Sequence, residues 1–396
     1  MIVAIDTLFL AKRYRRTGTG VYLNNLLLEF LRLAANERLG IEFHGFSAPN
    51  DDWATDGFVS PFLRVHKTRL LARRRCWVFG GMAFHTAAVH PDLVFLPNAT
   101  GSIPGPFRPL LSTILDAMPR RLPRDLVEAG RLAPLMSWVS AKLATKIITI
   151  SEWSKRDLVE VYGLDPAKIA VTYLGYDRRF YNETPSNPEA SAALLRRFGI
   201  RRPFVLHHGM VQLRKNIQRL IPAFDRVMGA HRTFDAQLVL AGPLGLGHEE
   251  ILQVRSASPN RNRVILTGEL PDNELGMLIR EASLCVIPSL YEGFCLPMVE
   301  AMACGVPTIA SNSSCLPEVS GGSLEYFDPA SIEAIADAIQ HALEDSTLRT
   351  RLRNRGLARV AQFSWERCAR ETLGAFGEVH LERRSTQVSA NARVAV

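Results

Sequence analysis

Short apolar runs alternate with longer amphipathic segments along the first half of the chain. The runs at residues 1–6, 93–96, 111–115 and 146–150 have the length and composition of buried strands. After the first run, residues 17–33 form a glycine-containing turn followed by apolar side chains at helical spacing, namely Leu23, Leu26, Leu27, Phe30 and Leu31. Ser151, directly after the last of these runs, is a predicted N-cap for a further helix.

The same alternation restarts at Pro203 and continues through the second half. Strands are predicted at residues 204–208, 237–241, 264–267, 284–288 and 308–310, and helices at 217–227, 249–257, 272–281, 331–343 and 347–363, with one more around Glu300. Alternation of this kind builds parallel sheets that bind ligands at the carboxyl ends of their strands. The sequence therefore predicts an α/β fold made of doubly wound, Rossmann-like units.

The chain is long enough for two domains, each with its own core. A polar stretch with two prolines, residues 181–189, is the predicted linker. We therefore expect one domain over residues 1–180 and a second over 181–363. Residues 364–384 are predicted to form one more helix, and the Ser/Thr/Asn/Ala-rich end, 385–396, is predicted to be disordered.

Composition is that of a soluble globular protein, with 47% hydrophobic and 22% charged residues. The six cysteines show no Cys-x-x-Cys pair, which favours reduced thiols and a cytoplasmic location. No uncharged apolar run is long enough to cross a membrane, and Asp6 comes too early for a signal peptide. His207-His208 lacks further ligands at metal-binding spacing, so we expect no metal site there.

The net charge of +8 arises in the first half of the chain. Its most basic part is residues 63–79, where Arg73, Arg74 and Arg75 stand among apolar and aromatic residues. This pattern suits peripheral contact with an anionic membrane, and a merely solvated helix face is the alternative. A basic surface can also bind nucleic acid, but the chain carries no nucleic-acid-binding motif, so no nucleic-acid partner is expected.

The segment from Ser289 to Glu300 carries the most informative chemistry. Glu292 and Glu300 flank a turn containing Gly293, after a predicted strand and before a helix that has Pro297 in its first turn. Backbone N–H groups of residues 293–298 would be partly unpaired there, where the helix dipole favours an anion such as a diphosphate. The first-turn Glu300 can accept hydrogen bonds from ribose hydroxyls. Alternatively, Glu292 is a solvated loop residue and Glu300 only a dipole partner.

These motifs resemble the retaining glycosyltransferases of family 4, two-domain GT-B enzymes. The resemblance rests on Glu-x7-Glu within Tyr291-Glu292-Gly293-Phe294-Cys295-Leu296-Pro297 and on Arg214-Lys215-Asn216 after the predicted strand at 204–208. Further matches are Ile5-Asp6 with Thr17-Gly18-Thr19-Gly20, residues 148–154, Val264–Leu270 and Pro317-Glu318-Val319, so that the likeness covers roughly residues 1–375. It implies two domains that face each other across a deep cleft, with the helix at 364–384 crossing back to the first domain.

The resemblance also implies roles for particular residues. Arg214 and Lys215 would bind the diphosphate, and Glu292 would hold donor-sugar hydroxyls and stabilise the oxocarbenium-like centre without acting as a nucleophile. Asp116 is a further catalytic candidate. Besides these, the implied donor-binding residues are Gly18, Thr19, Gly20, Gly209, Glu269, Leu270, Gly293, Phe294, Cys295, Leu296 and Glu300. Gly18–Gly20 could alternatively form a purely structural turn. For Arg214 and Lys215 the alternative is a basic loop that binds no ligand.

Three positions depart from the family pattern. Leu115 replaces the His that relatives often carry before Asp116, Met210 stands where several relatives have Arg, and Cys295 replaces the usual second Gly of the turn. The added Cys295 side chain narrows the pocket. No Asp-x-Asp triplet is present to hold a divalent cation, so no metal or other cofactor is expected.

The expected function is transfer of a hexose from a nucleoside diphosphate sugar to a glycan or lipid-linked glycan in polysaccharide synthesis. Resemblance to bacterial polysaccharide mannosyltransferases favours GDP-mannose as the donor. The expected location is cytoplasmic, with possible attachment to the inner face of the membrane. A nucleotide-sugar epimerase on the same fold and a non-catalytic sugar-nucleotide or glycan-binding module remain alternatives.

Overall fold

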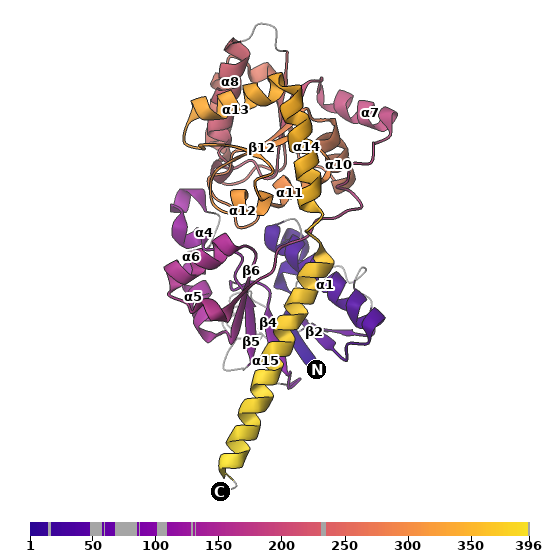
Figure 1. Cartoon of the computed structure of the whole chain (residues 1–396), viewed down its shortest axis with the longest axis vertical. Coiled ribbons are helices and arrows are strands. Elements are labelled where there is room, and N and C mark those ends of the chain that lie inside the picture. Colours follow the sequence, from indigo (N-terminus) through magenta and orange to yellow (C-terminus); the bar gives the residue numbers. More distant parts are fainter. Residues whose placement is uncertain are drawn as a thin grey trace. The chain divides into compact units, whose positions relative to one another are not determined.

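The computed structural model describes residues 1–14, 17–47, 58, 60–67, 85–86, 88–100, 109–127, 130, 132–230 and 235–394, without the side chains of 13 and 383–394. The chain divides into two compact units (Figure 1). The first unit comprises residues 1–120, 129–175 and 364–396, and the second comprises 121–128 and 176–363. Of the predicted basic segment 63–79, only residues 63–67 lie within the described residues.

The first unit is built on a parallel sheet that has seven strands in the described residues, in the order β3-β2-β1-β4-β5-β6-β7. The strands are β1 (Ile2–Asp6), β2 (Glu42–Ser47), β3 (Leu63–Lys67), β4 (Leu93–Leu96), β5 (Leu110–Thr113), β6 (Lys146–Thr149) and β7 (Ile169–Val171). The α-helices are α1 (Gly18–Glu37), α4 (Met118–Arg121, whose last residue falls in the second unit), α5 (Ala133–Leu143), α6 (Glu152–Tyr162) and α15 (Trp365–Val394). Ser151 caps α6 as predicted, since its Oγ accepts a hydrogen bond from the N–H of Ser154.

The second unit repeats this architecture with strand order β10-β9-β8-β11-β12-β13. Its strands are β8 (Phe204–His208), β9 (Gln237–Ala241), β10 (Val264–Gly268), β11 (Leu284–Ile287), β12 (Thr308–Ser311) and β13 (Glu325–Phe327). Its helices are α7 (Pro188–Phe198), α8 (Ile217–Ala230), α9 (His248–Ala257), α10 (Asp272–Glu281), α11 (Leu296–Ala303), α12 (Leu316–Ser320), α13 (Ile332–Glu344) and α14 (Ser346–Val360). All strand pairs are parallel, so the predicted doubly wound sheets are present in both units.

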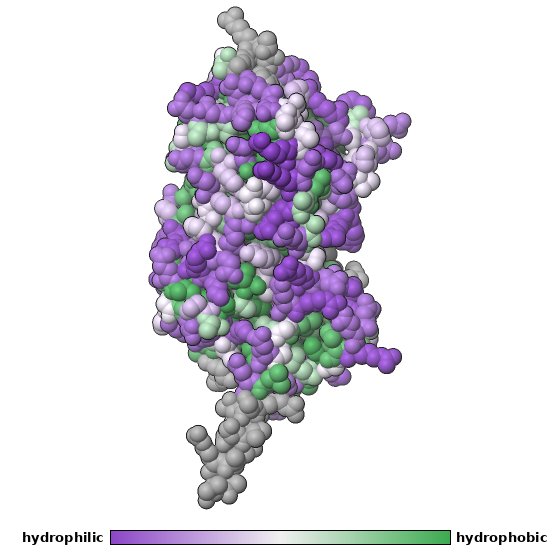
Figure 2. All heavy atoms as spheres, viewed as in Figure 1, coloured by the Kyte–Doolittle hydropathy of each residue, from purple (hydrophilic) through white to green (hydrophobic). Residues whose placement is uncertain are grey.

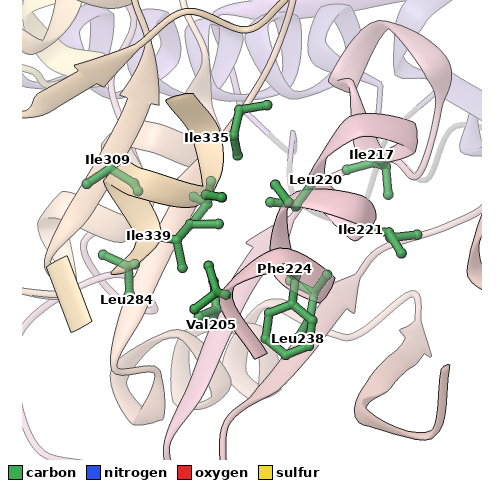
Figure 3. Close-up of a cluster of buried hydrophobic side chains, with 14 of the residues drawn as sticks. Val205, Ile217, Leu220, Ile221, Phe224, Leu238, Leu284, Ile309, Ile335 and Ile339 are labelled. Atoms are coloured by element: carbon green, nitrogen blue, oxygen red, sulfur yellow. The ribbon is translucent and has the colours of Figure 1, made fainter. Parts of the chain in front are cut away.

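One face of the second sheet is covered by α8 and α13, and the side chains between them form a dry core (Figure 3). Val205, Leu238 and Leu284 rise from the strands, and Phe224 of α8 and Ile339 of α13 meet them. Each of these five side chains is fully buried. Burial of an aliphatic or aromatic side chain contributes about 1.5–3 kcal/mol, so this core fixes the strands whose carboxyl ends carry the candidate site.

The domain boundary lies earlier than predicted, between residues 175 and 176. Residues 181–189 are not a free linker, because Tyr181 is buried and its hydroxyl donates to Asp272 of α10. Arg280, on the same helix, donates to the carbonyl groups of Phe180 and Asn182. Residues 121–128 also belong to the second unit, where Leu126 packs against the core.

The last helix differs from its predicted end. α15 packs along α1, β4 and β6 of the first unit and continues to Val394, whereas disorder was predicted from residue 385. No Pro or Gly occurs after Gly377 to interrupt the helical backbone. Residues 395–396 lie outside the described residues.

The surface of the first unit shows two features that bear on the predicted membrane contact. Residues 63–67 form the edge strand β3 instead of a helix, and Arg64 of this strand pairs with Glu42 of β2. Leu132, Leu135 and Trp138, at or just before α5, are exposed, and hydrophobic residues are visible in the area of α5 in Figure 2. In the described part of the chain, no helix has both the length and the apolar character needed to span a bilayer.

Candidate functional site

The candidate site lies at the carboxyl ends of β8 and β11 in the second unit. These two strands are neighbours, and the chain leaves them toward opposite sides of the sheet, because β9 pairs with the other edge of β8 and β12 with the other edge of β11. In an open α/β sheet such a switch point leaves a crevice where ligands bind. The loop after β8 carries Gly209, Arg214 and Lys215, and the loop after β11 carries Glu292.

An ion cluster joins these two loops. The Lys215 ammonium lies 2.5 Å from Oε1 of Glu292, and Nη1 of Arg214 lies 3.1 Å from Oε2 of the same carboxylate. The same Arg214 nitrogen donates to the carbonyl oxygen of Tyr291 at 2.6 Å. All three side chains are largely buried. The predicted diphosphate ligands therefore meet the predicted sugar ligand, and the cluster carries a net positive charge.

Glu292 is ionised despite its burial. Burial by itself would raise the pKa of Glu292, but the charges of Lys215 and Arg214 outweigh it and lower this pKa to about 2. The alternative of a solvated loop carboxylate is excluded, since the residue is only 7% exposed. A carboxylate with so low a pKa stays charged at neutral pH, which suits electrostatic stabilisation of a cationic centre and not proton donation.

Three serine residues, Ser311 at the end of β12 and Ser313 and Ser314 just after it, hold the loop that carries Glu292. The N–H of Glu292 donates to Oγ of Ser314 at 2.9 Å, and the hydroxyl groups of Ser311 and Ser313 donate to the carbonyl groups of Ser289 and Leu290. Sequence reasoning missed these serines. The signal was the polar run that follows the strand, because parallel strands bring their carboxyl ends to one edge of the sheet.

Helix α11 begins at Leu296, after Cys295 in the left-handed conformation with φ 73°. Residues 293–298 were predicted to have partly unpaired N–H groups; among them, Met298 N–H donates to the carbonyl of Cys295, and Pro297 has no N–H. For the N–H groups of Cys295 and Leu296, the described part of the chain shows no acceptor, and the dipole at this helix start favours an anion. Burial, followed by the nearby Glu292 charge, raises the pKa of the Cys295 thiol to about 12.

Glu300 lies in the second turn of α11 and not in the first, since the helix begins only at Leu296. Its Oε2 lies 3.3 Å from Nε2 of His208, the last residue of β8. His208 was not predicted as a site residue, because the His207-His208 pair was considered only as a metal site, and further ligands at suitable spacing were lacking. Glu300 is therefore close to the same strand end from which Arg214 and Lys215 follow.

Further predicted donor residues lie around this crevice edge. Gly209, with φ 115°, directly follows β8, and the side chain of Pro297 approaches it. Glu269 and Leu270 follow β10, where Leu270 is buried and Glu269 is exposed. Phe294 is buried and packs edge-on against Phe363, with ring centroids 5.3 Å apart. Gly293 connects Phe294 to Glu292 in the same loop.

The remaining predicted residues belong to the first unit. Gly18 opens α1, and the N–H of Gly20 donates to the capping hydroxyl of Thr17. Thr19 accepts a hydrogen bond from Asn98, which follows β4, while Asp116 follows β5 and accepts one from the N–H of Met118. The predicted turn and Asp116 are thus both at the carboxyl edge of the first sheet. Their role toward a ligand remains a prediction.

In the described part of the chain, no group of three or more His, Cys, Asp or Glu side chains is arranged to hold a metal ion. His207 is buried, and its Nδ1 lies 3.1 Å from the carbonyl oxygen of Val286. Burial, together with the nearby Lys215 charge, lowers the pKa of His207 to about 3, so this imidazole is neutral.

Comparisons with known proteins agree with this geometry. Residues 196–359 match the family model of glycosyl transferases group 1. The O-antigen chain mannosyltransferase B of Escherichia coli is 29% identical over 381 residues, covering 92% of this chain and 97% of that protein. The serotype-specific mannosyltransferase WbdA of Escherichia coli is 35% identical over 181 residues, which is 44% of this chain and 21% of WbdA.

Solved structures show the same fold. Sucrose-phosphate synthase from Thermosynechococcus elongatus superimposes with a TM-score of 0.74 at 20% identity, over 96% of this chain and 100% of that one. HepE of Anabaena, solved with UDP and glucose, gives a TM-score of 0.73 at 17% identity, again over 96% and 100%. The predicted GT-B class, with two Rossmann-like units, is confirmed. Residues 196–359 therefore form a glycosyl transferases group 1 domain, and the chain is a homologue of the O-antigen mannosyltransferases of Escherichia coli.

Proposed function

We propose that this protein transfers a hexose, with retention of anomeric configuration, from a nucleoside diphosphate sugar to a hydroxyl group of a growing polysaccharide. The observation that carries the proposal is the buried cluster of Lys215, Arg214 and Glu292 at the switch point of the second sheet. The curated relatives support glycosyl transfer, and their names favour mannose. We therefore take GDP-mannose as the donor.

Charge development explains why this cluster suits the reaction. Departure of a nucleoside diphosphate places negative charge on the phosphates and positive charge on the anomeric carbon. Lys215 and Arg214, with the N–H groups at the start of α11, supply the positive field for the diphosphate without a metal ion. Glu292 holds the donor-sugar hydroxyls and stabilises the cationic centre. Glu300 accepts hydrogen bonds from the ribose hydroxyls. In the first unit, Asp116 and the turn Gly18–Gly20 complete the proposed set.

Before the donor binds, the two cations Lys215 and Arg214 share the carboxylate of Glu292. Because Lys215 and Arg214 both contact Glu292, a diphosphate has to replace the carboxylate as their main partner. The exchange keeps an anion beside the two cations and turns the Glu292 oxygens toward the sugar. We propose this exchange of counter-ions as the step that couples donor binding to activation of Glu292.

The test combines binding and turnover. A thermal-shift panel of GDP-mannose, UDP-glucose, ADP-glucose and dTDP-glucose, run with EDTA, identifies the donor, because a ligand that binds only the folded state raises the melting temperature. NMR of the product made with a polysaccharide acceptor then reports the anomeric configuration. Stabilisation by GDP-mannose in EDTA and an α-linked product are expected. Release of an isomerised free sugar without acceptor would indicate an epimerase, and donor binding without turnover would indicate a binding module.

We further propose that the protein works on the cytoplasmic side of the membrane and attaches to it peripherally. The basic composition of residues 63–79 and the exposed Leu132, Leu135 and Trp138 support this. Flotation with vesicles containing anionic lipid should recover the wild-type protein and less of the triple variant in which Arg73, Arg74 and Arg75 are Ala. Equal recovery of both would contradict attachment through this segment.

A further inference from the structure

Three polar side chains from three elements, Cys285, His208 and Glu300, contact one another in sequence. His208, at the end of β8, is 1% exposed. Its Nε2 lies 3.3 Å from Oε2 of Glu300 on α11, and its Nδ1 lies 3.8 Å from Sγ of Cys285 on the neighbouring strand β11. The imidazole therefore stands between a buried thiol and the carboxylate proposed to bind ribose.

The chemistry of the two partners fixes where the imidazole proton is. Burial raises the pKa of Cys285 far above its usual range, so this group is a thiol and its S–H is a hydrogen-bond donor. Nδ1 of His208 then accepts, which leaves the proton on Nε2, facing the carboxylate. This arrangement places the thiol donor at Nδ1 and the carboxylate acceptor at Nε2.

Nε2 of His208 makes no well-formed hydrogen bond in the described part of the chain. The atom is completely buried, and Oε2 of Glu300 is 3.3 Å away. A small rotation of the carboxylate would align the two groups, and catalytic hydrogen bonds often tighten only in the complex. A buried donor left unpaired is unfavourable, so alignment of the two groups is favoured.

We propose that His208, oriented by Cys285, is a positioning residue that holds Oε2 of Glu300 and leaves Oε1 to accept a ribose hydroxyl. The inference rests on the proposed function and deepens it. The neighbouring His207 differs in that its Nδ1 faces the backbone carbonyl oxygen of Val286, and no carboxylate forms an ion pair with it in the described part of the chain. No Lys or Arg pairs with Glu300 in the described part of the chain, so His208 is the partner that can set its rotamer.

A ribose-specific binding experiment separates positioning from packing. Calorimetry measures the affinity of GDP and UDP, and of their 2′,3′-dideoxy analogues, for the wild type, His208→Phe and His208→Gln. His208→Phe should weaken binding of the ribonucleotide about tenfold while the dideoxy analogue binds as before, which corresponds to roughly 1.4 kcal/mol. His208→Gln, whose amide N–H replaces Nε2–H, should restore most of the loss. His44→Gln, at a buried histidine on β2 of the first unit, is the matched control and should change neither affinity.

The outcomes are distinct. If the wild type binds neither GDP nor UDP, the proposed function fails and this inference fails with it. If the wild type binds but His208→Phe weakens the ribonucleotide and its dideoxy analogue equally, His208 is structural and only this inference is overturned. Unchanged affinity in His208→Phe overturns it as well.

A second measurement does not depend on a variant that folds. In the wild type, ¹⁵N NMR of the His208 imidazole should show the Nε2–H tautomer, and addition of the ribonucleotide should shift the Nε2 resonance. The Nδ1–H tautomer would overturn the proposal.

Cys285→Ala should lower ribonucleotide affinity two- to threefold and leave the affinity for the dideoxy analogue unchanged. If this variant loses affinity for the ribonucleotide and for the dideoxy analogue alike, the proposed orientation of His208 by Cys285 is contradicted.

Discussion

Lys215 and Glu292 form a buried ion pair of 2.5 Å although 77 positions separate them in the chain. The lysine follows β8 and the glutamate follows β11, so the pairing of these two strands brings the side chains together. Breaking a buried pair leaves one charge uncompensated, which usually costs more than removing both partners. The pair thus links the stability of the second unit to its chemistry.

Lys215→Met should therefore destabilise the protein by about 3–5 kcal/mol, because in the described part of the chain Glu292 keeps only Arg214 as a cationic partner. The double variant Lys215→Met/Glu292→Gln should recover part of this loss. Urea unfolding followed by circular dichroism measures both free energies. If the double variant loses as much free energy of unfolding as the two single variants lose together, or more, the pairing is contradicted.

Acid should weaken the second unit through Glu292. Its pKa is lowered in the folded protein to about 2, below the ordinary value of 4.5. A depressed carboxyl pKa contributes stability that is complete above the unfolded value and disappears as the pH falls through the folded one. The wild-type free energy of unfolding should thus decrease between about pH 5 and pH 2, and the Glu292→Gln variant should show a shallower decrease over the same window. Parallel curves for the two proteins would contradict the assigned pKa.

The two glutamates should separate in kinetics. Glu292→Gln should lower kcat by about 10²–10³ with little change in donor affinity, because the charge is needed mainly when the anomeric carbon becomes cationic. Glu300→Gln and Lys215→Ala should instead weaken nucleotide binding about tenfold, since both side chains are proposed to contact the nucleotide already in the bound donor. Steady-state rates and calorimetry measure the two effects. Full activity of Glu292→Gln would falsify its assigned role.

Cys295 should tolerate glycine better than valine. Its φ of 73° is a left-handed conformation that costs a non-glycine residue about 1–2 kcal/mol. Cys295→Gly relieves this strain, which stabilises the folded state. It also removes a buried side chain and raises the entropy of the unfolded chain, which both destabilise the folded state, so we expect the free energy of unfolding to change by no more than about 1 kcal/mol. Cys295→Val should lose at least about 2 kcal/mol, because a branched side chain is poorly accommodated there. Equal stability of the two variants in thermal unfolding would argue against a left-handed residue at this helix start.

Gly242 and Gly268 offer a matched pair at neighbouring strand ends. A Cβ on Gly242 would lie 2.0 Å from the carbonyl oxygen of Gly209, whereas a Cβ on Gly268 meets nothing within 4 Å. Gly242→Ala should therefore displace the Gly209 backbone beside the site, lowering stability by more than about 2 kcal/mol and weakening donor binding. Gly268→Ala should lose only about 1 kcal/mol from its left-handed backbone, with donor binding unchanged. Thermal unfolding and calorimetry on both variants decide this.

The sequence alone predicted most strands and helices of the fold. The runs at 204–208 and 237–241 are the strands observed, and Asp272–Glu281 is the helix observed, because apolar periodicity is a local property of the chain. The strands β2, β3 and β13 were missed. The motif at 289–300 also located the region of the site, since its turn and its proline have local conformational preferences.

Contacts between distant segments were decided only by the tertiary structure. Pairing of β8 with β11 makes Lys215 a partner of Glu292 and places His208 between Cys285 and Glu300. Packing against α10 draws residues 181–189 into the second unit, which composition had suggested was a linker. Local preference follows from each residue and its neighbours, whereas these contacts depend on which strands become adjacent and on the burial that adjacency imposes.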